Sequence, residues 1–160
     1  MRLPMADKPR DKVEREILVR TSVERAFAAL TDPALFPSWG PERIEGTLAP
    51  GERPILDFGA AGGGKVAIYV VAFEPPRYFA YRWVQGVTDP KILLGDPLAG
   101  HNTLVEFHVE AVEEGARVRV VESGLSALPG FPGFDPDKAI EHMGEGWRLM
   151  LDGLGRRLST

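Results

Sequence analysis

The clearest pattern of apolar and polar positions lies at the C-terminal end of the chain. Between Pro136 and Leu158, apolar side chains recur every three or four residues and charged side chains fill the opposite positions. Asp135 is a suitable N-terminal cap, and proline is tolerated at the first helical position. The pattern predicts one amphipathic helix of roughly 34 Å. We expect this helix to cross a whole sheet, with its buried stripe centred on Trp147.

Alternating apolar and polar residues, typical of β-strands, occupy most of the chain before this helix. Residues 13–20 form the first expected strand. Turns rich in Pro and Gly then separate six more, and hairpins are expected around residues 75–76 and 113–115. These six predicted strands are 43–48, 53–58, 65–74, 77–85, 102–112 and 116–123.

Two short helices are expected between the first strand and the second. Thr21 or Ser22 caps an amphipathic stretch that starts at residue 23. Asp32 and Pro33 then begin a second helical turn, which ends near Trp39. The segments 86–101 and 124–134 are long and rich in Gly and Pro, yet they contain apolar residues. Long loops with apolar residues usually pack over another part of the protein, and we expect these two at the mouth of a cavity.

Composition narrows the classes of protein that fit. The 160 residues are 44% hydrophobic and 26% charged, which is ordinary for one globular domain. A net charge of −4 gives no basic surplus for nucleic acid. No apolar run reaches the roughly 20 residues of a membrane span, so no membrane insertion is expected. The absence of cysteine suits a cytoplasmic location. Residues 1–12 are expected to be a flexible leader, followed by a single domain over 13–160.

Four stretches resemble one known family. They are TSVERAFAALTDPALFPSW (21–39), FEPPRYFAYRW (73–83), TLVEFHVEAVEEGARVRVVESGL (103–125) and GEGWRLMLDGLGRRL (144–158). Their order and spacing resemble the activator-of-heat-shock-ATPase-like branch of the START/polyketide-cyclase (SRPBCC) superfamily. The resemblance implies an α+β helix-grip fold, in which a curved seven-stranded antiparallel sheet holds the C-terminal helix around a hydrophobic cavity. The chain departs from the family pattern in its glycine-rich segment 59–65 and its long 86–101 loop.

The glycine-rich segment has the spacing of a phosphate-binding loop, with Gly59, Gly64 and Lys65 at the matching positions. However, Val66 stands where a magnesium-binding hydroxyl belongs, and a strand is expected where a helix should follow. We therefore reject nucleotide binding and expect a flexible connection between strands. The histidines have no metal-ligand spacing, and no serine lies in a GxSxG motif. No metal or other cofactor is expected.

The predicted ligand-binding residues are mainly aromatic and apolar. Period-two alternation places Phe79, Tyr81 and Trp83 on one sheet face, and a filled core is the competing interpretation. Gly144 and Gly146 permit either close contact between helix and sheet or entry of a ligand. The full predicted set is Trp39, Phe58, Phe79, Tyr81, Trp83, Phe107, Val120, Glu122, Met143, Trp147 and Met150.

Glu122 is the main polar candidate, because alternation places it on the inward face two residues after Val120. A buried carboxylate needs partners, whereas one at a strand end can reach solvent. Three functions stay open. The first is binding of a small hydrophobic ligand, such as a lipid, a fatty acid or an aromatic metabolite. The second is a cyclase or dehydratase in which Glu122 acts with Tyr81 or His101 as acid and base. The third, implied by the family and ranked last, is stimulation of a chaperone ATPase. A homodimer through an exposed strand or sheet face is also compatible with the sequence.

Overall fold

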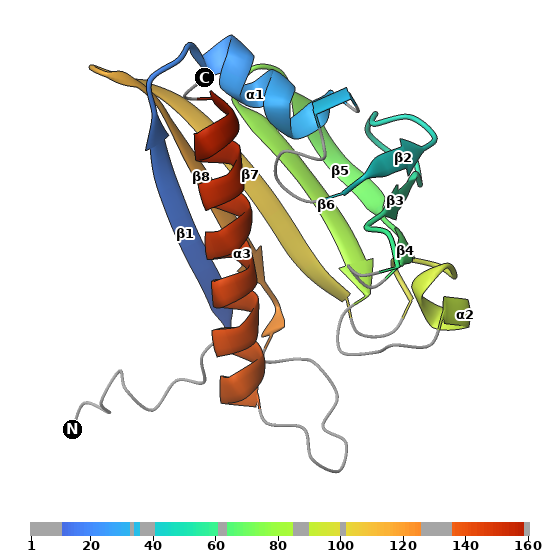
Figure 1. The fold of residues 1–160 in the computed structure, drawn as a ribbon. Helices are drawn as coiled ribbons and strands as arrows, with labels where there is room; N and C mark the ends of the chain where they lie inside the picture. The colour runs from blue at the N-terminus through green and yellow to red at the C-terminus, as the bar shows by residue number, and fades with distance from the viewer. Residues whose placement is uncertain are drawn as a thin grey trace, which may run out of the picture.

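Five antiparallel strands form the larger of two sheets in the computed structural model (Figure 1). In spatial order they are β1 (Lys12–Val19), β8 (Gly115–Ser123), β7 (Asn102–Val112), β6 (Tyr78–Val84) and β5 (Tyr69–Glu74). The structure describes residues 11–32, 34–35, 41–60, 64–84, 90–99, 102–125 and 136–158.

A second sheet of three short strands completes the β-structure. It consists of β2 (Arg43–Glu45), β3 (Ile55–Asp57) and β4 (Lys65–Ala67). The strand predicted over 65–74 is therefore two strands, β4 and β5, which separate at Ile68. The Ile68 amide still donates to the Pro54 carbonyl at 2.9 Å, so the chain bends from one sheet into the other without losing this hydrogen bond. Among the described residues there are thus eight strands in two sheets, where the sequence predicted seven in one.

The first helix, α1 (Val23–Thr31), forms where the sequence predicts it. The Ser22 hydroxyl accepts a hydrogen bond from the Arg25 amide at 3.1 Å and so caps the helix. After it, the Leu35 amide donates to the Asp32 carbonyl at 2.8 Å, as expected for a second short turn. Residues 33 and 36–40, which include the predicted end of that turn at Trp39, lie outside the described residues.

The long helix α3 (Pro136–Leu158) has the predicted bounds and packs mainly along β1, at one side of the sheet, not across all the strands (Figure 1). Two glycines ease this approach, because a Cβ at Gly144 or Gly155 would force the Arg15 or Ile17 side chain of β1 to move. The opposite side of α3 faces the small sheet and the short helix α2 (Pro90–Leu93), which lies within the predicted loop 86–101. The predicted α+β helix-grip architecture is confirmed.

The β7–β8 hairpin depends on a glycine, and we expect Gly115→Ala to destabilise the protein. Gly115 has φ +151°, and a Cβ there would overlap the carbonyl oxygen of Val19 on β1. A suitable control is Gly51→Ala, since Gly51 has φ +85° but open space around it. Urea unfolding should give a loss of about 1–2 kcal/mol for the control and a clearly larger loss for Gly115→Ala. Equal losses would mean that steric overlap of the new methyl group with the Val19 carbonyl does not affect stability.

Candidate functional site

The inward face of the large sheet carries the aromatic row that alternation predicted. Phe79 pairs with Phe107, Tyr81 with Val105, and Trp83 with Thr103, in the register of β6 against β7. Phe79, Phe107 and Tyr81 are at most 2% exposed, and Trp83 is 7% exposed. Trp83, near the C-terminal end of β6, is therefore the most exposed side chain of the row.

The carboxyl group of Glu122 on β8 accepts hydrogen bonds from three side chains among the residues that the structure describes. The indole Nε1–H of Trp83 donates to Oε2 at 3.0 Å, and the Thr103 hydroxyl donates to the same oxygen at 2.6 Å. The indole Nε1–H of Trp147 donates to Oε1 at 2.9 Å. Glu122 is 0% exposed, so these donors replace the hydration that its burial removes. The expectation that Glu122 points inward is met, and the alternative that it reaches solvent is not.

The shared carboxyl group fixes the two indole rings beside each other. The ring centroids of Trp83 and Trp147 are 6.2 Å apart with an interplanar angle of 29°. Phe107 packs edge-on against Trp147 at 5.7 Å, and Phe58 packs against Trp83 at 6.2 Å. Because each indole is held by both packing and a hydrogen bond, its position is set before any ligand enters.

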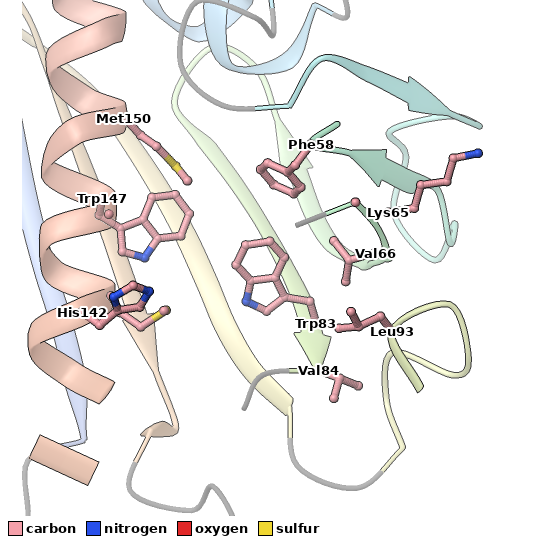
Figure 2. A pocket seen from close by; sticks show the side chains of 12 residues that line it. Phe58, Lys65, Val66, Trp83, Val84, Leu93, His142, Trp147 and Met150 are labelled. Atoms are coloured by element: carbon pink, nitrogen blue, oxygen red, sulfur yellow. The ribbon is translucent and has the colours of Figure 1, made fainter. Parts of the chain in front are cut away.

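A pocket of about 300 Å³ lies over these indoles, between α3 on one side and Phe58, β4 and α2 on the other (Figure 2). Its volume is at the lower end of the range for small-molecule sites. The described residues that line it are Phe58, Gly64, Lys65, Val66, Trp83, Val84, Leu93, His142, Met143, Gly146, Trp147 and Met150.

Few of the described side chains that line the pocket offer a free polar group. Both indole N–H groups are occupied by Glu122. The Lys65 side chain points away from the pocket, and its ammonium pairs with Glu45 at 2.9 Å (Figure 2). Only His142, an exposed residue at the rim, adds an imidazole. The other lining side chains are aromatic, aliphatic or thioether, and they suit a flat, largely apolar molecule.

The predicted ligand-binding residues divide into three groups. Five line the pocket: Phe58, Trp83, Met143, Trp147 and Met150. Five others are buried in the structure and are not among the lining residues: Phe79, Tyr81, Phe107, Val120 and Glu122. Trp39, and His101 with it, lie outside the described residues.

Sequence reasoning missed several lining residues and one partner of Glu122. Val66 and Leu93 line the pocket but are not in the predicted ligand-binding set, although the apolar residues of the 86–101 loop indicated a loop at the mouth of a cavity. Thr103 gave no signal, because a threonine in a strand is common. Close helix–sheet contact and entry of a ligand were the two roles predicted for Gly144 and Gly146, and the two glycines differ in their surroundings. Gly144 meets β1, whereas nothing lies within 4 Å of a Cβ built at Gly146, which lines the pocket.

The glycine-rich segment connects β3 to β4 and helps to form one pocket wall. The Phe58 amide donates to the Gly64 carbonyl at 2.9 Å. Asp57 accepts from the Gly59 amide at 2.9 Å and from Arg43 Nε at 2.9 Å. The Gly59 hydrogen bond, and then the Arg43 guanidinium, lower the pKa of Asp57. A strand follows the segment, so it has no helix N-terminus at which phosphate binds.

The described residues give no support to two other kinds of site. They contain no group of three or more His, Asp or Glu side chains placed to hold a metal ion. None of the described helices combines the length and hydropathy that a membrane span requires.

Comparison with known proteins identifies the family. The family model "Activator of Hsp90 ATPase homolog 1-like protein" matches residues 20–159, which is most of the chain. The chain belongs to this family. The predicted resemblance to this branch of the SRPBCC superfamily is confirmed. The search of curated proteins gave no match.

Several solved structures have the same fold as this chain. Protein MLL2253 from Mesorhizobium loti is 24% identical, with a TM-score of 0.67 over 91% of this chain and 94% of that one. DynU16, from the dynemicin biosynthetic locus, is 24% identical with a TM-score of 0.72, and the match covers 94% of this chain but 48% of DynU16. The Aha1 dimer from Colwellia psychrerythraea is 20% identical with a TM-score of 0.65, over 92% and 96% of the two chains.

We expect Glu122→Gln to lower the free energy of unfolding of this Hsp90-activator-like domain by about 1–3 kcal/mol. A glutamine offers one carbonyl oxygen in place of two carboxylate oxygens, and its NH₂ group faces donors. Indole N–H signals of Trp83 and Trp147 in NMR spectra should shift as well. Glu110→Gln is the control, because Glu110 pairs with Arg117 on the exposed face and should change stability by less than about 0.5 kcal/mol. Similar effects of the two variants would contradict the proposed arrangement.

The lowered pKa of Asp57 predicts a pH-dependent contribution to stability. The folded state favours the ionised form, so its stabilising effect is complete above the ordinary aspartate pKa of about 3.9 and is lost as pH falls through the folded value. The stability difference between wild type and Asp57→Asn should therefore be largest near neutral pH and shrink in acid. Urea unfolding over a series of pH values measures this, and a constant difference would show that Asp57 does not act through its charge.

Proposed function

We propose that this domain binds a small, flat, apolar molecule in the pocket between α3 and the β2–β3–β4 sheet. The observation that carries the proposal is the pair of pocket-lining indoles, Trp83 and Trp147, held by one buried carboxyl group. Rings that are fixed in advance lose little conformational entropy when a ligand packs against them.

The chemistry of the walls favours an aromatic or alicyclic ligand over a long fatty acid. Phe58 and the two indoles offer flat faces, while Met143 and Met150 adapt to the outline of the bound molecule. No described lining residue presents a free cation for a carboxylate, because Lys65 is paired with Glu45 and points away. An aromatic metabolite is therefore the member of the predicted ligand class that fits best.

An acid–base enzyme is a weaker alternative. Glu122 would have to exchange protons with a substrate, but both of its oxygens already accept hydrogen bonds and it is not among the lining residues. The geometry supports a positioning role for Glu122. Two partners also stay proposals: a second copy of the chain and a chaperone. A dimer is stated for the Colwellia psychrerythraea structure, and chaperone activation is named in the family description.

The test uses substitutions at Gly146, where the absence of a side chain leaves space in the pocket. Gly146→Leu would place a branched side chain in the pocket, whereas Gly146→Ala adds one methyl group where nothing lies within 4 Å. Both substitutions should stabilise α3 by about 0.5–1 kcal/mol, because glycine is unfavourable inside a helix. Indane, a small bicyclic hydrocarbon, is the probe, and its binding is followed by NMR shifts of the two indole N–H signals.

We expect indane to bind the wild type and Gly146→Ala with similar affinity, and to bind Gly146→Leu at least about tenfold more weakly. Thermal unfolding checks that both variants are folded. Equal affinity for the leucine and alanine variants, or no binding to the wild type, would contradict the proposal.

A further inference from the structure

The Tyr81 hydroxyl group is buried without a partner. Tyr81 is 0% exposed, and its hydroxyl makes no hydrogen bond to any residue that the structure describes. An unsatisfied buried hydroxyl is rare in folded proteins, because it loses its hydrogen bonds to water and gains nothing in return. The other buried polar groups of this face, Glu122 and Thr103, are hydrogen-bonded to each other.

Tyr81 directly contacts one of the two indoles that line the pocket. Its ring packs edge-on against Trp83, with centroids 5.2 Å apart. Trp83 lines the pocket and also belongs to the buried cluster that contains Tyr81, and Met150, another lining residue, packs against that cluster. A methionine side chain changes shape easily, so the part of the pocket wall that Met150 forms can yield to a ligand.

The electrostatic surroundings define which ligand group would suit this hydroxyl. Burial, and then the negative charge of Glu122, raise the pKa of Tyr81 well above its ordinary value. The phenol therefore keeps its proton, and what it lacks is an acceptor. An anionic acceptor would be repelled by Glu122, whereas a neutral carbonyl oxygen would not.

We infer that Tyr81 is the hydrogen-bond donor of an inner subsite of the pocket, and that this subsite takes a neutral carbonyl oxygen of the bound ligand. The inference rests on the proposed function, since it adds one polar contact to an otherwise apolar site. It narrows the ligand class to flat ring compounds that carry a ketone or a related uncharged acceptor. A site that donates to a ligand oxygen discriminates against the same molecule without that oxygen.

The test compares indane with 1-indanone, which has the same ring skeleton and one ketone oxygen. Each is titrated against the wild type, Tyr81→Phe and Tyr78→Phe. The Tyr78 variant is the matched control, because it removes a hydroxyl that donates to Glu106, outside the residues that line the pocket. Dissociation constants come from NMR titration, and melting temperatures are measured without ligand.

We expect Tyr81→Phe to bind 1-indanone about three- to tenfold more weakly than the wild type, and to bind indane unchanged. Its melting temperature without ligand should rise by about 2–4 °C, because an unsatisfied buried group is removed. Tyr78→Phe should leave both affinities unchanged and should not raise the melting temperature.

Two results would overturn the inference alone: equal effects of Tyr81→Phe on both compounds while indane still binds, or a melting temperature that does not rise. The first would mean that no ligand oxygen reaches the hydroxyl, and the second that the hydroxyl already has a partner. If the wild type binds neither compound, the proposed function itself fails and the inference falls with it.

Discussion

The hydrogen bonds to the Glu122 carboxyl group are the constraint on which the site depends. They join four elements, since Glu122 lies on β8, Trp83 on β6, Thr103 on β7 and Trp147 on α3. No two of these residues are neighbours in sequence, so the group can form only when the sheet has its final register and the helix its final position. A buried carboxyl group tolerates few alternative arrangements, because any arrangement that loses a donor leaves charge or polarity uncompensated. The same contact therefore specifies the fold and shapes the pocket.

An acidic residue in a ring-lined cavity is often expected both to position the rings and to contact the contents of the cavity. Here Glu122 positions the rings only. The carboxyl group does not present itself to the pocket, and the indoles present only their carbon faces because their N–H groups are turned toward Glu122. The result is an apolar floor built on a polar support. Tyr81 completes the contrast, since it is the described buried side chain of this face whose polar atom is left unmatched.

Much of the architecture could be read from the sequence because it follows from regular periods. The helix bounds follow from Pro136 and the three- and four-residue spacing of apolar positions, and the face shared by Phe79, Tyr81 and Trp83 follows from alternation. The bend at Ile68 did not follow, because an unbroken run of strand-forming residues carries no signal of a change of sheet. The hydrogen-bond donors to Glu122 could not be predicted from the sequence either, because they depend on cross-strand register and on the position of α3. The sequence placed the pocket beside the C-terminal helix, and five predicted residues line it, but the facing wall built from β4 and α2 did not follow from any local pattern.

The bend at Ile68 has a consequence for how such a domain can diversify. The hydrogen bonds that fix the indole floor all lie within the large sheet and α3, while the described facing wall consists of β4, the helical turn α2 and the residues Phe58 and Gly64. The wall strand β4 continues into the large sheet through Ile68, so changes in the length or composition of the wall need not disturb the floor. The floor and the facing wall are thus structurally separable, and substitutions confined to the wall would reshape the pocket while the hydrogen bonds to Glu122 stay in place.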